Sequence, residues 1–385
     1  TTRNSLIQLL NIAGVGPIFG PILGALYGPV AFVWIVIGCI FAGAVHDYLT
    51  GMISIRNHGA HLPQLAGKFL GKTMKHVVNG FAILLLLLVG TVFVTSPAAL
   101  LANMTSLSLT LIILAIFAYY LIATLLPIDK VIGRIYPYFG ALLLFSAAGI
   151  GIGLVVTGAP IPELSFQNMH PDNAPIFPLL FLTISCGALS GFHATQTPII
   201  SRTTENETNG RKIFYGMMIA EGVIAMIWAA AAMSLFQGEQ SLSDVLAAGG
   251  PAAVVGEVST TMLGAVGGTL AVLGVIVLPI TSGDTAFRSA RMIIADYLKV
   301  EQKPIVKRIL IALPLFVASY ALTHMDFTLL WRYFSWANQT TAVIALWTGT
   351  MYLVLSRKPY LITSIPVVFM TMATFTYLAY APIGF

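Results

Sequence analysis

Apolar stretches about as long as a membrane is thick recur along the whole chain, separated by short polar segments. A helix needs about 20 mostly apolar residues to cross a bilayer, and stretches of this length occur about eleven times. The strict apolar–polar alternation of membrane β-strands is a different pattern. The sequence therefore predicts an all-α polytopic membrane protein with spans at about 5–27, 30–56, 77–96, 107–127, 134–157, 176–200, 211–236, 253–281, 305–322, 326–354 and 359–381.

Glycine and proline interrupt two of these spans. The first reads NIAGVGPIFGPILGALYG over residues 11–28, and the sixth reads FPLLFLTISCGALSGFHATQTPII over residues 177–200. An unpaired backbone amide in hydrocarbon costs several kcal/mol, so a broken helix persists there only where it faces a protein cavity. We expect the sixth span to line a polar site midway through the membrane, because the same turns carry Ser185, Ser190, His193, Thr195, Gln196 and Thr197.

The positions of the two interruptions indicate an internal symmetry. They fall in the first and sixth spans, and an odd offset places the second unit upside down relative to the first. We expect inverted five-helix repeats at 1–157 and 176–354, an outer loop at 158–175 and an additional span within 355–385. Interrupted helices at matching positions of two halves are the best sequence indication of a transporter site. Close helix packing around small residues is the alternative.

The composition excludes a soluble globular domain. Hydrophobic residues make up 57% of the chain and charged residues only 9%, against about 25% charged residues in soluble domains. The net charge of +5 does not indicate nucleic-acid binding, because no basic stripe with interleaved aromatic residues is present. Cys39 and Cys186 lie in apolar stretches without disulfide or metal-binding spacing, so we expect them to be packing residues.

The basic residues indicate the orientation of the chain. With the spans above, every Lys and Arg except Arg332 falls on one side of the membrane. The other side carries Glu163, Asp172, Glu239, Asp244 and Asp326 instead. The positive-inside rule assigns the basic side to the cytoplasm, so we expect a cytoplasmic N-terminus and an outer C-terminus. The Arg332 side chain is expected to reach outward to the interface.

Three ionisable residues within the spans are candidates for chemistry. His46 and Asp47 lie roughly 13 Å from the cytoplasmic end of their helix, where a carboxylate costs a few kcal/mol unless it is paired or protonated. A proton carrier or gate is one interpretation, and a structural ion pair or helix cap is the other. Glu221 lies nearer the middle of its span. It is a candidate for proton coupling or, alternatively, a protonated side chain bonded between helices.

Two further polar groups lie near the ends of spans. At the cytoplasmic end of the eighth span stand Thr281, Ser282, Asp284 and Arg288, which predict either an inner gate or ion site or a simple i,i+4 ion pair. In the tenth span, Asn338 and Gln339 lie deeper than the outer aromatic belt. They would either line the cavity or join helices by hydrogen bonds.

Several segments resemble the carbon starvation protein A (CstA) family of bacterial membrane transporters: NIAGVGPIFGPILGALYG, FAGAVHDY, SCGALSGFHATQTP, SGDTAFRSARMIIADYL and FSWANQ. The resemblance implies a fold related to the amino acid–polyamine–organocation superfamily, with five-plus-five inverted repeats. It also implies uptake of small organic nutrients, peptides or pyruvate, with protons. By the matching motifs, the breaks would comprise Gly14, Gly16 and Pro17 in one helix and Gly191, Phe192, His193 and Thr195 in the other. Asp47, Asp284 and Arg288 also fall at family positions. Family members usually carry a further N-terminal hydrophobic segment, so upstream sequence is expected before residue 1.

We therefore expect a secondary transporter of the bacterial cytoplasmic membrane that works by alternating access and is not an enzyme. Its partners would be a peptide or 2-oxo acid substrate, protons or another coupling ion, and the lipid bilayer, without nucleic acid, cofactor or metal. The expected substrate-binding residues are Gly14, Gly16, Pro17, Ser190, Gly191, Phe192, His193, Thr195, Asn338 and Gln339. The expected coupling or gate residues are His46, Asp47, Glu221, Thr281, Ser282, Asp284 and Arg288.

Two other classes of function stay open on the sequence. A membrane enzyme could use His46, His193 and nearby carboxylates as a metal or acid–base site, although no HExxH or comparable spacing is present. A passive channel would use the same polar residues to line a pore. An ATP-driven pump is disfavoured, because the chain contains no nucleotide-binding motif.

Overall fold

The computed structural model describes residues 2–125, 129–238 and 241–380, with the backbone alone for residues 129–137. This part of the chain is helical and forms no β-strand, only an isolated bridge between Gln237 and Ser241. The elements are α1 Thr2–Ile12, α2 Gly16–Gly24, η1 Ala25–Tyr27, α3 Val30–Ile37, η2 Gly38–Gly43, α4 Ala44–Arg56, α5 Leu62–Phe69, α6 Lys72–Met104, α7 Leu109–Leu125, α8 Asp129–Val156, α9 Ile176–Thr183, α10 Gly191–Ser201, η3 Glu207–Asn209, η4 Arg211–Tyr215, α11 Gly216–Leu235, α12 Leu242–Leu298, α13 Ile305–Leu322, α14 Phe327–Leu355 and α15 Leu361–Tyr380.

The all-helical membrane architecture predicted from the sequence is confirmed, whereas the count of about eleven spans stays a prediction. Among the described residues, seven helices are long and apolar enough to cross a bilayer, or eight if the bent pair α1 and α2 counts as one span. The remaining expected spans coincide with α7, which has 17 residues, with the short helices α9 and α10, and with α14. α14 carries Arg332, Asn338 and Gln339 among its apolar residues.

Two of the helical stretches bend at non-helical residues. α1 and α2 meet at an angle of 47° across a short break. The long element α12 contains non-helical residues at Gly250 and Gly264, whose φ angles are +64° and +69°. Positive φ is readily adopted only by glycine, so these two residues allow α12 to change direction before its long segment continues to Leu298.

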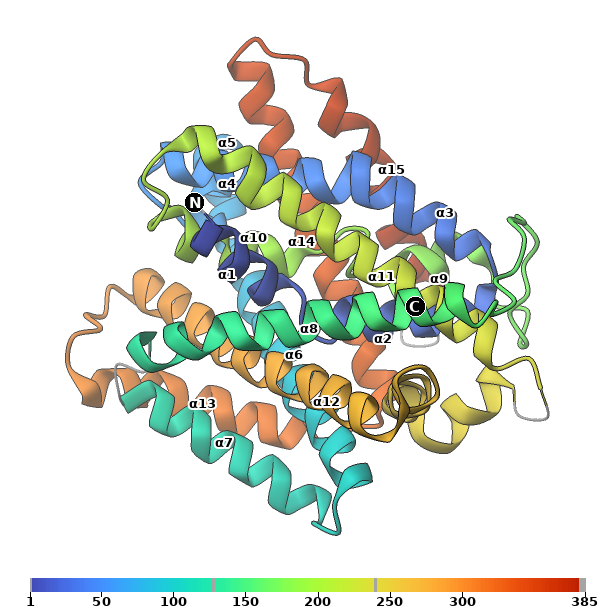
Figure 1. Cartoon of the computed structure of the whole chain (residues 1–385). Coiled ribbons are helices and arrows are strands. Elements are labelled where there is room, and N and C mark those ends of the chain that lie inside the picture. Colours follow the sequence, from blue (N-terminus) through green and yellow to red (C-terminus); the bar gives the residue numbers. More distant parts are fainter. Residues whose placement is uncertain (1, 126–128, 239–240, 381–385) are drawn as a thin grey trace.

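The helices form one bundle with interrupted elements near its middle (Figure 1). α6 and α12 pack along each other, and α8 packs against α12. α4, α10 and α14 form a second group of mutual contacts. α7 and α13 lie side by side on one flank, and α15 covers α14 and α9 on the other (Figure 1).

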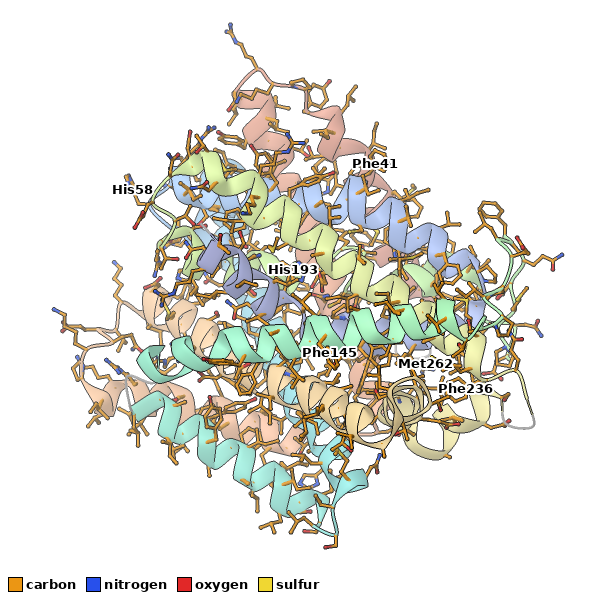
Figure 2. The ribbon with its side chains drawn as sticks, in the orientation of Figure 1. Phe41, His58, Phe145, His193, Phe236 and Met262 are labelled. Atoms are coloured by element: carbon orange, nitrogen blue, oxygen red, sulfur yellow. The ribbon has the colours of Figure 1, made fainter. Side chains whose placement is uncertain are left out.

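The outer surface of the bundle is apolar, as expected of a protein surrounded by lipid. Phe41 and Phe145 are 61% and 55% exposed, and both lie on the outside of the bundle (Figure 2). Ionisable residues lie in the interior instead: His46, Asp47 and Glu221 are fully buried. An apolar exterior around a buried polar centre is the arrangement that the low charge content predicts.

Candidate functional site

The interruption between α9 and α10 spans residues 184–190 and requires a glycine at its centre. α9 ends at Thr183, and α10 begins at Gly191. Gly187 has a φ of +86°, and a Cβ atom added there would lie 2.5 Å from the Cβ of Ala225 on α11. Both the left-handed backbone and the close approach of α11 therefore exclude a larger residue at this position.

The break between α1 and α2 packs directly against this segment. α1 ends at Ile12, and α2 begins at Gly16 with Pro17 in its first turn, where a missing amide hydrogen does no harm. A Cβ atom on Gly16 would lie 2.5 Å from the Sγ atom of Cys186, and one on Gly20 would lie 3.3 Å from the carbonyl oxygen of Thr183. The small residues of the first break thus allow the two interrupted helices to touch.

Asp47 on α4 holds two imidazole rings at once. Its Oδ1 atom lies 2.8 Å from Nδ1 of His46, and its Oδ2 atom lies 2.8 Å from Nδ1 of His193 on α10. All three side chains are fully buried, and His193 lies near the middle of the bundle (Figure 2). The π-helical turn η2 precedes α4, and such turns are frequent at functional sites. The structure thus brings together Asp47 and His193, two sequence candidates that are 146 residues apart.

Glu221 on α11 extends this cluster toward the interrupted helix. Its Oε2 atom lies 3.5 Å from Nε2 of His193, and the Glu221 side chain is fully buried. The next residue, Gly222, packs against the carbonyl oxygen of Gly187, because a Cβ atom there would lie only 3.3 Å from that oxygen. Glu221 therefore stands where α4, α10, α11 and the interruption at 184–190 come together.

The ionisation of Asp47 would determine the roles of the ring nitrogens. An ionised carboxylate only accepts hydrogen bonds, so with Asp47 in this form the Nδ1 atoms of His46 and His193 donate to it. The Nε2 atom of His193 then faces Oε2 of Glu221 at 3.5 Å. A single proton on this pair would give either imidazolium with carboxylate or neutral imidazole with carboxylic acid. Asp47 orients the ring for both forms, because buried charges need paired, hydrogen-bonded partners.

The two amides of the tenth span bind the backbone of the interrupted helix. The Oδ1 atom of Asn338 accepts a hydrogen bond of 2.8 Å from the N–H of Phe192, and its Nδ2 atom donates to the carbonyl of Ser185 at 2.8 Å. Gln339 donates to the carbonyl of Phe181 on α9 at 3.1 Å. Both side chains are fully buried.

The other residues expected to bind substrate lie around the same breaks. The ring of Phe192 packs edge to face against Phe93 of α6, with 5.8 Å between the ring centres. A Cβ atom on Gly14 would lie 2.8 Å from the same Phe93 ring, so α6 bridges the two interruptions. The Thr195 hydroxyl donates to the carbonyl of Phe192 within α10.

The four residues expected at an inner gate lie together on α12, at the end of α1. The hydroxyl of Ser282 donates to the carbonyl of Leu10 at 3.3 Å, which connects α12 with α1 just before the first break. Thr281 bonds within its own helix. Asp284 accepts a hydrogen bond of 2.8 Å from Arg288, which is the i,i+4 pair considered from the sequence.

Two polar contacts between distant segments were not predicted from the sequence. Gln196 of α10 donates to Gln8 of α1 at 3.2 Å, and both amides are fully buried. A glutamine inside the first apolar stretch is the sequence signal for this contact. Just before α5, His61 lies 3.2 Å from Arg202 and 3.7 Å from Asp296. Burial and the nearby Arg202 lower the pKa of His61 to about 4, so it is neutral at physiological pH.

The cluster around Asp47 does not have the geometry of a metal centre. Within the described ranges, no group of three or more His, Cys, Asp or Glu residues is arranged to hold a metal ion. The side chains of the cluster contact one another instead: His46 contacts Asp47, Asp47 contacts His193, and His193 contacts Glu221.

An apolar helical exterior around interrupted helices and a buried ionisable centre defines the chain as a multi-helix membrane protein with a polar site inside the bundle. The sequence profile of the family described as "Carbon starvation protein CstA" matches residues 7–98, 78–246 and 239–377. The chain therefore belongs to the CstA family, which confirms the resemblance found in its motifs.

Some relatives of this chain are named by a function, and others are described only as membrane proteins. A Haemophilus influenzae protein described as an uncharacterized membrane protein is 52% identical over 302 residues, which cover 64% of this chain and 81% of that protein. A "Peptide transporter CstA" of Campylobacter jejuni is 29% identical over 287 residues, covering 56% of this chain and 40% of the relative. The "Pyruvate/proton symporter BtsT" of Escherichia coli is 26% identical over 297 residues, covering 59% and 41%. The alignments thus span about two fifths of these two transporters.

Proposed function

We propose that this protein is a proton-coupled secondary transporter that imports small carboxylate-bearing nutrients, peptides or 2-oxo acids such as pyruvate, by alternating access. The observation that carries the proposal is the buried series Asp47, His193 and Glu221 beside an interrupted helix. Intramembrane ionisable residues of this kind are typical of proton relays. The names of the peptide and pyruvate/proton relatives support the substrate class and the coupling ion.

The proposed architecture is the inverted repeat expected from the sequence. Units 1–157 and 176–354 would be related by inversion, with the loop 158–175 outside and the helix within 355–385 added at the end. Two observations support it: α1–α2 and α9–α10 are both interrupted, and Gly16 and Cys186 bring the interruptions into contact. The proposed location is the bacterial cytoplasmic membrane.

The proposed substrate site lies between the two interruptions. The helix ends that begin at Gly16 and Gly191 carry the positive end of a helix dipole, which suits a carboxylate, although the N–H of Phe192 is already bonded to Asn338. The residues proposed to contact the substrate are Gly14, Gly16, Pro17, Ser190, Gly191, Phe192, His193, Thr195 and Gln339. The side chains of Asp47, His193 and Glu221 are fully buried and therefore do not line an open pore in this conformation, which favours a transporter over a passive channel.

The proposed coupling mechanism moves one proton through the pair His193 and Glu221. Asp47 would fix the orientation of the His193 ring through one carboxyl oxygen, while its other oxygen is hydrogen-bonded to His46. Because Gly222 packs on Gly187, the charge on the neighbouring Glu221 would affect the interruption at 184–190. Thr281, Ser282, Asp284 and Arg288 would form the inner gate, since Ser282 is bonded to the end of α1.

Reconstitution into proteoliposomes tests the proposal. We expect radiolabelled pyruvate or a dipeptide to accumulate when the vesicle interior is more alkaline than the buffer, and to exchange in counterflow without a gradient. Counterflow without any response to the pH gradient would remove the proton from the mechanism. Absence of both processes for every carboxylate probe would contradict the transporter itself.

A further inference from the structure

The start of helix α10 receives its cap from a different helix. Ser190 occupies the N-cap position, where a serine usually accepts a hydrogen bond from its own helix, but its side chain makes no such bond. The N–H of Phe192 instead donates to Asn338 of α14, which is 146 residues away in the sequence. The end of α10 is thus fixed by α14 rather than by its own sequence.

The same amide also binds the other side of the interruption. The Nδ2 atom of Asn338 donates to the carbonyl of Ser185 at 2.8 Å and to the hydroxyl of Ser190 at 3.1 Å. Asn338 therefore contacts Ser185 near the beginning of the interruption 184–190, Ser190 at its end, and Phe192 in the first turn of α10. Its two amide hydrogens and its carbonyl oxygen are all used in these bonds.

The backbone of α14 packs tightly against the first residue of α10. A Cβ atom added to Gly191 would collide with the carbonyl oxygen of Asn338 and would lie 2.6 Å from the backbone nitrogen of Ala342. α10 therefore begins directly on α14. The residue that follows Phe192 is His193, whose Nδ1 atom lies 2.8 Å from Asp47.

We propose that Asn338 is a positioning residue that clamps the interruption between α9 and α10 from α14 and thereby keeps His193 aligned with Asp47 and Glu221. The clamp itself stands on the hydrogen bonds above, and only its consequence for coupling rests on the proposed transport function. In this role Asn338 holds the site together and is not a ligand of the substrate.

The accessibility of Cys186 measures the clamp without any substrate. The chain has two cysteines, Cys39 and Cys186, and the Sγ atom of Cys186 lies 3.8 Å from the Nδ2 atom of Asn338. In a Cys39→Ser parent, Cys186 is the single thiol and is only 3% exposed. We expect Asn338→Ala to raise the rate of N-ethylmaleimide labelling at least tenfold in purified, monodisperse protein.

Two other variants make this result specific. Thr348→Ala is the matched control, because the Thr348 hydroxyl is buried in α14 and, among the described residues, bonds only to Ile344 of its own helix. We expect its labelling rate to stay within twofold of the parent. Asn338→Asp keeps the shape and the acceptor for Phe192 but loses the donor to Ser185, so an intermediate rate is expected. It decides the question if Asn338→Ala does not fold.

Parent-like labelling of both Asn338 variants, or equal acceleration by Thr348→Ala, would overturn the clamp. The link to His193 has its own readout, the ratio of pyruvate uptake driven by a pH gradient to pyruvate counterflow. Loss of folded protein lowers both equally, whereas misalignment of His193 should lower the ratio at least tenfold in the Asn338 variants. An unchanged ratio contradicts that link. Absence of transport in the parent contradicts the proposed function and leaves the labelling result valid.

Discussion

At Asp47, one carboxylate receives hydrogen bonds from two imidazoles that come from different helices. Each of its oxygens has a partner at 2.8 Å, and the side chain has no contact with solvent. Removing the carboxyl group would leave His193 without the acceptor that fixes its ring, and an unsatisfied buried donor costs about 1–3 kcal/mol. Asp47 therefore holds the two rings in place.

We predict that Asp47→Asn lowers uptake driven by a pH gradient at least tenfold. The amide cannot accept from both imidazoles with equal strength and does not balance a proton on His193. Initial rates of pyruvate uptake in proteoliposomes, at equal amounts of folded protein, measure the effect. Asp172→Asn, an exposed position in the outer loop, is the control. Uptake by Asp47→Asn at the level of this control would show that the carboxylate is dispensable.

The buried ring of His61, just before α5, makes stability depend on pH. Its folded-state pKa of about 4 lies below the ordinary value of 6.5, because burial disfavours the charged ring. The stability is therefore complete above pH 6.5 and is lost as the pH falls from there toward 4, by about 2 kcal/mol at pH 5. Thermal unfolding at pH 7.5 and 5.0 should show a smaller loss in His61→Gln than in the parent. Equal losses in both proteins would exclude His61 as the source.

The interrupted helices are the elements that bring these residues together. Gly and Pro indicated an interruption in each of the first and sixth apolar stretches, but the expected residues were partly wrong. Gly16 and Pro17 begin α2, and Gly191, Phe192, His193 and Thr195 lie in the first turns of α10, whereas the non-helical residues are 13–15 and 184–190. The sequence could not show that Gly16 would pack on Cys186, because that contact depends on how α2 and α9 cross. Nor could it show that Asn338 binds Phe192 and Ser185, since a buried amide in one helix has many possible partners.

The conformation of Gly187 gives a prediction for the element as a whole. An alanine would adopt a φ of +86° and place its Cβ atom 2.5 Å from Ala225. We expect Gly187→Ala to destabilise the protein by about 2–4 kcal/mol from left-handed strain and overpacking. Gly256→Ala is a suitable control, because that helical glycine has open space around it. Melting temperatures in detergent compare the two. Equal values would mean that the interruption tolerates a side chain.

At the scale of the whole molecule, connecting loops gather at the two opposite ends of the bundle. The segments 57–61 and 299–304 lie at one end, and the segments 158–175 and 237–238 lie at the other (Figure 1). The sequence assigned the first group to the cytoplasm from its Lys and Arg residues. The position of the bundle in the membrane and the relation between the two proposed repeats depend on how all the helices pack. No single stretch of sequence specifies that packing.

The orientation can be measured in a cysteine-free background made by Cys39→Ser and Cys186→Ser. We predict that an impermeant maleimide labels Gln167→Cys, in the outer loop, on intact cells. Glu301→Cys should be labelled only after the membrane is permeabilised. Both positions are exposed, so burial does not explain a difference between them. The reverse pattern would place the N-terminus outside.

The central claim is that Glu221 and His193 share the proton that moves with the substrate. The most direct test measures proton and pyruvate fluxes together in proteoliposomes that contain a pH-sensitive dye. We predict that Glu221→Gln retains pyruvate counterflow but loses pyruvate-dependent proton movement at least tenfold, whereas Glu257→Gln, an exposed carboxylate on α12, retains both. Proton movement by Glu221→Gln at the parental ratio to pyruvate would contradict the account.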